Sequence, residues 1–232
     1  SIKFDEVNEE KLNLESFSFN SLELKEVNFF YEYNKPTLTN INLKINKGDK
    51  IAIVGKSGAG KTTLLNLILG LLRPSAGSLF LNTQNSKKIN YTNIFGLLPQ
   101  ESFILNDSFD KNITLSEKKE KKIDIIDAIN LANLDDFYNK KTRRFVKRTS
   151  TNFSEGEKQR IGISRVFYSK KKVLVFDEPT SSLDSLNEKK IMDVIISMPR
   201  DITVIIVTHK LNSFIIVNNS YYIINFWCAD FC

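Results

Sequence analysis

One segment of the sequence carries glycines, a lysine and a threonine at the spacing that phosphate binding requires. It reads Gly55-Lys56-Ser57-Gly58-Ala59-Gly60-Lys61-Thr62 and matches the pattern G-x-x-x-x-G-K-[ST] without a gap. Glycines let the backbone curl so that several N–H groups point at one phosphate chain. The ammonium of Lys61 adds a full positive charge there, and the hydroxyl of Thr62 is a ligand that Mg²⁺ accepts. The segment predicts a site for the phosphate chain of a nucleotide with Mg²⁺.

Two acids follow a wholly apolar run, Val173–Phe176, farther along the chain. An acid at the carboxyl end of a buried parallel strand lies where α/β proteins bind their ligands. Asp177 can therefore hold Mg²⁺ through water, and Glu178 can polarise an attacking water molecule. Alone, the pattern also fits a strand that ends in a solvated acidic turn. The phosphate-binding pattern in the same chain favours the catalytic interpretation.

Short apolar runs alternate with helical segments, and these elements must position the motifs. Such runs are typical of central parallel strands that are covered on both faces, so the fold class is α/β. We expect a buried helix over Lys61–Leu72, ended by Arg73-Pro74, and a helix over Lys122–Leu134 within a helical, charged block at about residues 101–172. The runs expected as strands are Leu22–Phe30, Leu38–Ile45, Lys50–Val54, Ser78–Leu81, Val173–Phe176 and Ile202–Val207.

The composition excludes several classes of protein. The chain has 232 residues, 41% of them hydrophobic and 26% charged, which is typical of a globular domain with a core. One histidine excludes a His-rich metal site, and two cysteines cannot form a disulfide framework, so Cys228 and Cys232 are expected to be free thiols. No apolar run approaches the ~20 residues of a membrane span, and the chain starts without the pattern of a secretory signal. It also starts without Met, so we expect it to be part of something longer or processed.

The net charge of +6 comes from one segment, Lys140–Arg148, which contains six basic residues and no acid. A local patch of this kind is not a nucleic-acid-coating surface, so no nucleic-acid partner is expected. A solvated loop and a contact with an acidic partner or lipid headgroups both remain open.

Six motifs in order make the chain resemble the nucleotide-binding domain of ATP-binding cassette (ABC) transporters over nearly its whole length. Besides the phosphate loop and the Asp177-Glu178 pair, the matching positions are Gln100 of the Q-loop, Phe153–Glu157 of the signature, Asp184 of the D-loop in Ser181–Asp184, and the switch histidine His209. Tyr31, upstream of the loop, resembles the aromatic residue that stacks on adenine, with Tyr33 and Phe30 as rivals.

This resemblance implies a P-loop NTPase (RecA-like) core with a mostly parallel sheet, an N-terminal antiparallel β subdomain and a helical insertion. Residues 21–232 would be the ATPase domain, with the helical subdomain at about 101–172, and residues 1–20 a linker from an upstream membrane domain. The ligands implied are ATP, held by Tyr31 and by Gly55 through Thr63, and Mg²⁺, held by Thr62, Gln100 and, through water, Asp177. The catalytic residues implied are Glu178, His209 and Gln100.

The signature departs from its usual form, LSGGQ. Ser154 and Gly156 remain, but Phe153, Glu155 and Glu157 replace Leu, Gly and Gln. In the family this loop meets ATP held by the other protomer, where Glu155 would place negative charge near a phosphate and weaken the contact unless its side chain turns away. Ser154-x-x-Glu157 is also a capping box that would start a helix reaching about Tyr168. The family's acidic segment upstream is replaced by Val146–Ser150 with reversed charge, and the chain end, Asn225–Cys232, lacks the usual glycine turn and strand.

The main hypothesis for function is a transport ATPase domain of an exporter or flippase, because Leu105–Ser108 and Lys111–Ile113 resemble the exporter stretch after the Q-loop. Its partners would be a second nucleotide-binding domain, identical or different, and a membrane domain fused upstream, at the cytoplasmic face of the cell membrane. One alternative is a soluble ABC ATPase of chromosomes or ribosomes. The short span from Gln100 to Phe153, which has no heptads, argues against the chromosome type, and the presence of a single cassette argues against the ribosome type. Another is a regulator that binds ATP without turnover, which the altered signature favours and Glu178 opposes.

Overall fold

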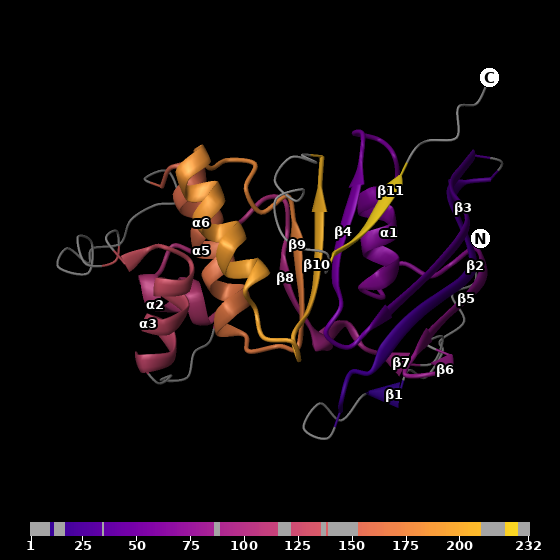
Figure 1. Cartoon of the computed structure of the whole chain (residues 1–232), viewed down its shortest axis with the longest axis horizontal. Coiled ribbons are helices and arrows are strands. Elements are labelled where there is room, and N and C mark those ends of the chain that lie inside the picture. The colour runs from indigo at the N-terminus through magenta and orange to yellow at the C-terminus, as the bar shows by residue number, and fades with distance from the viewer. Residues whose placement is uncertain are drawn as a thin grey trace.

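A five-stranded parallel sheet lies at the centre of the protein (Figure 1). The computed structural model describes residues 10–11, 17–33, 35–85, 89–115, 122–135, 138, 153–209 and 221–226. In spatial order the central strands are β11 (Tyr221–Phe226), β4 (Lys50–Gly55), β10 (Thr203–Thr208), β9 (Val173–Asp177) and β8 (Phe95–Leu98). All of them run in the same direction.

A second, antiparallel sheet flanks the first and comes from the N-terminal part of the chain. Its order is β3 (Lys35–Asn46), β2 (Ser21–Glu32), β5 (Ala76–Leu81) and β6 (Gln84–Asn85). The short strands β1 (Glu10–Lys11) and β7 (Ile89–Asn90) pair in parallel beside it, and a 3₁₀ helix, η2, spans Thr92–Ile94. The α/β class and the combination of the two sheets confirm the expected fold.

The helices lie on both faces of the parallel sheet. Helix α1 (Lys61–Ile68) lies between the two sheets, whereas α5 (Glu155–Tyr168) and α6 (Ser185–Ile196) cover the opposite face of the parallel sheet (Figure 1). Helices α2 (Phe109–Thr114) and α3 (Lys122–Leu131) pack against α5 on its outer side. The parallel sheet is thus covered on both faces, as its apolar strands predict.

Successive residues of each central strand belong to two different cores. In β4, Ile51 and Ile53 pack with α1 and the antiparallel sheet, while Ala52 and Val54 pack with the helices on the other side. Because side chains alternate across a strand, a strand that is apolar throughout can fill both cores. Each core fixes one face of the sheet, and together they hold the carboxyl ends of the strands in register.

Two helices end earlier than the apolar pattern indicates. Helix α1 ends at Ile68 and not at Leu72, because Gly70 has a φ of 75° and the amides of Leu71 and Leu72 both donate to the carbonyl of Asn66. A left-handed glycine after the last turn is a common helix end. The expected stop at Arg73-Pro74 was therefore wrong, since the chain has already left the helix. Helix α3 likewise ends at Leu131, before Asn133, whose φ is 53°.

Several sequence expectations fall outside the described residues. They concern most of residues 1–20, the basic segment Lys140–Arg148, the reversed-charge stretch Val146–Ser150, and Cys228 and Cys232. Among the helices that the structure describes, none combines the length and the apolar character that crossing a bilayer takes.

Candidate active site

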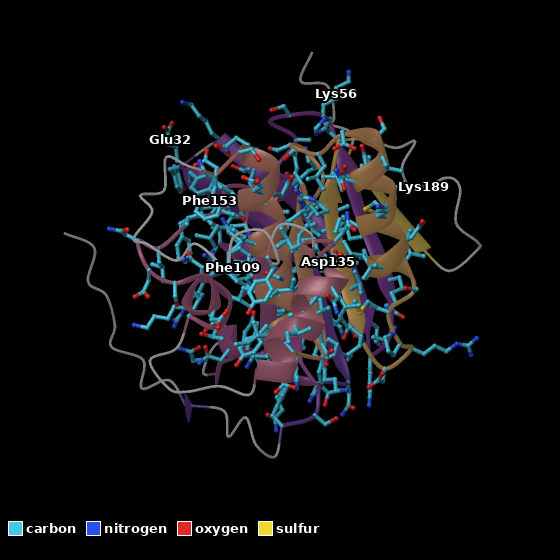
Figure 2. All side chains as sticks on the ribbon, turned by 90° about the vertical axis from the view of Figure 1, so that its left-hand side faces the viewer. Glu32, Lys56, Phe109, Asp135, Phe153 and Lys189 are labelled. Atoms are coloured by element: carbon cyan, nitrogen blue, oxygen red, sulfur yellow. The ribbon has the colours of Figure 1, made fainter. Side chains whose placement is uncertain are left out.

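The predicted functional residues follow the carboxyl ends of three neighbouring strands. Strand β10 lies between β4 and β9, and its register places Val207 opposite Asp177 and Thr208 opposite Val54. The phosphate-binding loop after β4, the acids at the end of β9 and the histidine after β10 therefore share one edge of the sheet. Lys56 of this loop lies at the upper edge of the molecule in Figure 2.

A cavity of about 550 Å³ lies at this edge. It is lined by Thr37, Ser57, Gly58, Gly60, Lys61, Thr62, Thr63, Gln100, Asp177, Glu178 and His209. Ten of these residues are sequence candidates, drawn from four separate motifs. The eleventh, Thr37, comes from β3 of the antiparallel sheet and was missed, because no local pattern shows that a strand distant in the sequence reaches this loop.

The phosphate-binding loop is curled around the ammonium group of Lys61. Lys61 is buried, and its Nζ donates to the carbonyl oxygens of Gly55 (2.8 Å) and Lys56 (2.9 Å). Gly60 has a φ of 88°, and a Cβ there would come within 2.9 Å of the Leu38 side chain and 3.2 Å of the Thr37 carbonyl oxygen. Only glycine fits this conformation and this close approach without strain. Helix α1 begins at Lys61, so its N-terminal amides face the cavity, where they favour an anion.

Glu178 and His209 form a pair within the cavity. The Oε1 atom of Glu178 lies 3.1 Å from Nδ1 of His209, with the glutamate side chain 18% exposed and the histidine 51%. The neighbouring Asp177 is buried, which raises the pKa of its carboxyl group; the charge of Glu178 raises this pKa further, while Lys61 lowers it. The carboxylate of Glu178 is partly exposed and lines the same cavity as the phosphate-binding loop, which is the placement of a general base.

The aromatic candidate Tyr31 lies beside the phosphate-binding loop and does not line the cavity. Its hydroxyl lies 3.2 Å from Oγ1 of Thr63, and its ring packs edge-on against Phe29 at 4.9 Å between centroids. The side chain is 63% exposed, which leaves ring surface available for stacking. The rings of the rivals Tyr33 and Phe30 pack against each other, with 6.1 Å between their centroids.

The signature residues lie at the start of α5, and one of them, Glu155, lines a second cavity. Ser154 caps the helix: its Oγ accepts from the amide of Glu157, and Glu157 in turn accepts from the amide of Ser154, as the sequence predicted. A cavity of about 250 Å³ is lined by Gln100, Glu101, Ser102, Glu155, Lys158, Gln159, Ser181 and Ser182. Gln100 thus borders both cavities, while Ser154, Gly156 and Glu157 line neither of the two.

The carboxylate of Glu155 forms an ion pair with Lys158 of the same helix. Lys158, one helical turn farther along α5, donates from Nζ to Oε1 of Glu155 at 2.6 Å. The Glu155 side chain is 73% exposed, so solvent also screens its charge. This ion pair was not expected, although the spacing of three residues on a helix permits it.

The D-loop residue Asp184 caps helix α6 and does not line the phosphate cavity. Its carboxylate accepts from the amides of Leu186 and Asn187 and from the side chain of Asn187. These bonds, with that from the Asn187 amide foremost, lower the pKa of Asp184. Asn187 also accepts from Asn133 at 2.8 Å, which ties the D-loop to the end of α3.

The oxygen ligands in the large cavity fit Mg²⁺. Thr62, Gln100 and Asp177 contribute a hydroxyl, an amide and a carboxylate, and Mg²⁺ is usually held by one or two carboxylates together with phosphate oxygens and water. Within the described part of the chain, no three His, Cys, Asp or Glu side chains gather where they could hold a metal ion by themselves. With the hydroxyl, amide and carboxylate of the large cavity as ligands, Mg²⁺ would be shared with the phosphates of a nucleotide.

Sequence comparison places the chain among proteins named for export. It is 33% identical over 201 residues to a putative export ATP-binding/permease protein of Rickettsia typhi. The aligned region covers 83% of this chain and 35% of that protein. It is 34% identical over 209 residues to the lactococcin-G-processing and transport ATP-binding protein of Lactococcus lactis subsp. lactis, covering 87% of this chain and 30% of that protein. The chain thus spans about a third of the length of these relatives.

Structural comparison supports the same fold. A bacterial Atm1-family ABC exporter with ATP bound superposes with a TM-score of 0.79 at 24% identity, over 96% of this chain and 39% of that chain. The family model for ABC transporters matches residues 38–181, which is more than half of the chain and includes the phosphate-binding loop, Gln100, the signature and Glu178. The chain therefore belongs to the ABC transporter family and is an ATP-binding, ATP-hydrolysing domain.

Proposed function

We propose that this domain powers the export or flipping of a substrate across a membrane, by closing onto a second nucleotide-binding domain when ATP binds and reopening after hydrolysis. A transmembrane partner fused upstream, through residues 1–20, would place it at the cytoplasmic face. Residues 101–172 would form the helical subdomain that meets this partner. The observation that carries the proposal is the single cavity in which the phosphate-binding loop, Gln100, Asp177, Glu178 and His209 meet. The names of two relatives, a putative export ATP-binding/permease protein and a lactococcin-G-processing and transport ATP-binding protein, support it.

In this proposal the loop after β4 holds the phosphates of ATP. The backbone amides of Gly55 to Thr63 and the N-terminus of α1 donate to phosphate oxygens, and Lys61 exchanges its two carbonyl partners for the β- and γ-phosphates. Thr62, Gln100 and, through water, Asp177 would hold Mg²⁺, which neutralises charge on the phosphates when bound. Asp177 lies beside Glu178 and interacts with the charge of Lys61, so its carboxylate would also contribute to the electrostatic potential at the attacking water.

Glu178 would take the proton from the attacking water, and His209 would orient that carboxylate. The 3.1 Å contact between Oε1 and Nδ1 fixes one oxygen of Glu178, which leaves the other available for water. Gln100 would contribute its amide oxygen and pass changes at the site to the second cavity that it also borders.

Tyr31 would stack on the face of the adenine ring. Stacking of this kind makes few contacts with the edge of the base, so it discriminates little between bases. We expect Tyr31→Ala to weaken ATP binding by about 1–3 kcal/mol, the scale of one base–aromatic stack. Tyr31→Phe should keep the affinity, because the ring rather than the hydroxyl carries the stacking. Calorimetric titration with ATP measures both. Tyr33→Ala is the matched control, and a larger effect of that variant would show that Tyr33 provides the platform.

The signature residues Ser154, Glu155, Gly156 and Glu157 would complete the site of the other protomer, with Asp184 near the same interface. The pair of Glu155 with Lys158 offsets the acid that replaces glycine in this signature. An uncompensated carboxylate beside the γ-phosphate would repel it in a partly dried interface. The ion pair lets the departure from the family pattern coexist with ATP-driven closure.

This compensation makes a prediction for dimer formation, which tests the proposed function. In a Glu178→Gln background with Mg²⁺ and ATP, the chain should form dimers on sedimentation. Lys158→Ala should weaken that dimer by about two- to fivefold, the scale of an exposed ion pair. Glu155→Gly should strengthen it, and in the Glu155→Gly background Lys158→Ala should have no further effect.

Three outcomes distinguish the possibilities. If Lys158→Ala weakened the dimer equally with Glu155 present and in the Glu155→Gly background, compensation of Glu155 by Lys158 would be contradicted. No dimer in any variant of this chain alone would contradict a homodimer, and dimer formation only with a different nucleotide-binding domain would indicate a heterodimeric transporter.

A further inference from the structure

The backbone of Glu178 has an unusual conformation that other residues must support. Its φ is 51°, in the left-handed region that residues other than glycine rarely adopt, directly after the end of β9. Such a conformation persists where the surroundings determine it. On one side the support is visible in the sheet, since the Glu178 amide donates to the carbonyl of Val207 at 2.9 Å. The carbonyl side of Glu178 is held by Gln159, a side chain outside the phosphate cavity.

Gln159 lies in the second turn of α5 and is 5% exposed. Its Nε2 donates to the carbonyl oxygen of Glu178 at 2.9 Å and to Oγ of Ser181 at 3.1 Å. Its Oε1 accepts from the amide of Ser182 at 3.1 Å. Both hydrogens and one acceptor position of the amide are thus used on a single stretch of chain, residues 178–182. Buried hydrogen bonds of this kind restrict a loop to one arrangement.

We propose that Gln159 is a positioning residue for Glu178, which it acts on through the backbone. The carboxylate of Glu178 reaches the cavity only if the residue keeps its left-handed conformation, because a change at this position turns the side chain away from His209. Gln159 does not line the phosphate cavity, so it contributes to placement and not to ATP binding. The inference rests on the proposed role of Glu178 as general base.

The test separates placement from binding and from stability. Gln159→Met removes all three hydrogen bonds at similar side-chain volume. It should lower kcat for ATP hydrolysis by about 10- to 100-fold, the scale of a misplaced catalytic group, and leave KM for ATP within about twofold. Gln159→Glu is the second variant: it can still accept from the Ser182 amide but as a carboxylate cannot donate to Glu178, so the same loss of kcat is expected.

Ser164→Ala is the matched control for a merely structural role. Ser164 is fully buried on the same helix, and its Oγ donates to the carbonyl of Ile161 at 2.7 Å, away from Glu178. This variant and both Gln159 variants should lower the melting temperature, but Ser164→Ala should keep kcat. If Ser164→Ala lowered kcat as much as Gln159→Met at equal loss of stability, the positioning role would be overturned.

A double variant distinguishes failure of this inference from failure of the proposed base. In a Glu178→Gln background, Gln159→Met should cause no further loss of kcat, because residues that act through one another are not additive. A further loss there, or normal kcat in both Gln159 variants while Glu178→Gln is inactive, would overturn the role of Gln159 alone. Normal turnover in Glu178→Gln would instead overturn the base itself, and with it this inference.

Discussion

Replacing Glu178 with glutamine should leave ATP bound and reduce kcat by about 100-fold or more, the scale of a lost general base. Glutamine has the same shape and keeps an oxygen that can face Nδ1 of His209, now 3.1 Å from Oε1, so the site should retain its geometry. It cannot take a proton from water at neutral pH. Phosphate release measures kcat, and calorimetric titration with ATP measures binding in the same preparation.

Glu23→Gln is the matched control for this prediction. Glu23 lies on the antiparallel sheet, where it pairs with Lys25 at 3.4 Å, outside the phosphate cavity. This variant removes the same charge and should hydrolyse ATP at the parent rate. Normal hydrolysis by Glu178→Gln would mean that water is activated by another group, and loss of ATP binding would mean that Glu178 belongs to the binding surface.

Three of the five central strands, β4, β9 and β10, were predicted from the sequence because each is mostly apolar, whereas β8 and β11 were not among the expected strands. Val173–Phe176 and Lys50–Val54 fill two cores at once, so neither strand shows the alternation of a sheet with one exposed face. Strand β8 was harder to detect, since its four residues include a glycine, Gly96, and are followed directly by Pro99. The position of Gly70 as the end of α1 was visible in the sequence, but a glycine within an apolar run also fits a helix interior.

Most of the candidate site follows from one topological rule. Residues at the carboxyl ends of neighbouring parallel strands must meet, so motifs far apart in the sequence, such as the loop ending at Lys61 and the pair Asp177-Glu178, share a cavity. Contacts between side chains and backbone do not follow from this rule. The three hydrogen bonds of Gln159 depend on the distance between α5 and the loop after β9. A sequence signal exists only in part: Gln159 shares a helix face with the buried Ile163 and Val166, at spacings of four and seven.

The signature shows what a local sequence pattern leaves open about electrostatics. The change of glycine to Glu155 predicts repulsion of a phosphate, and the sequence alone contains no sign of how the side chain turns. The structure places Lys158 against it, so the proposed interface would meet the charge of a pair. The capping box at Ser154, by contrast, was predictable, because both of its bonds lie within one turn of the helix.

The largest effect on binding is expected at Lys61. Lys61→Ala should abolish measurable ATP binding at modest nucleotide concentration, because Lys61 is the only lysine or arginine among the described residues that line the phosphate cavity. It is also buried and held 2.8 Å and 2.9 Å from two carbonyls of its own loop, so its charge is already placed at the phosphate site before ATP binds. Calorimetric titration with ATP measures the affinity, and thermal unfolding without nucleotide checks that the fold persists.

Lys56→Ala is the control within the same loop. Lys56 is exposed and faces out from the upper edge of the molecule, and its part in the proposed site is its backbone (Figure 2). Both variants lower the net charge by one, so long-range attraction of ATP falls by a similar amount. Lys56→Ala should therefore keep most of the affinity. An equal loss of affinity in both variants would mean that the general positive potential of the loop holds the phosphates, and not a directed contact from Lys61. Parent-like binding by Lys61→Ala would overturn the assignment of the loop as the phosphate site.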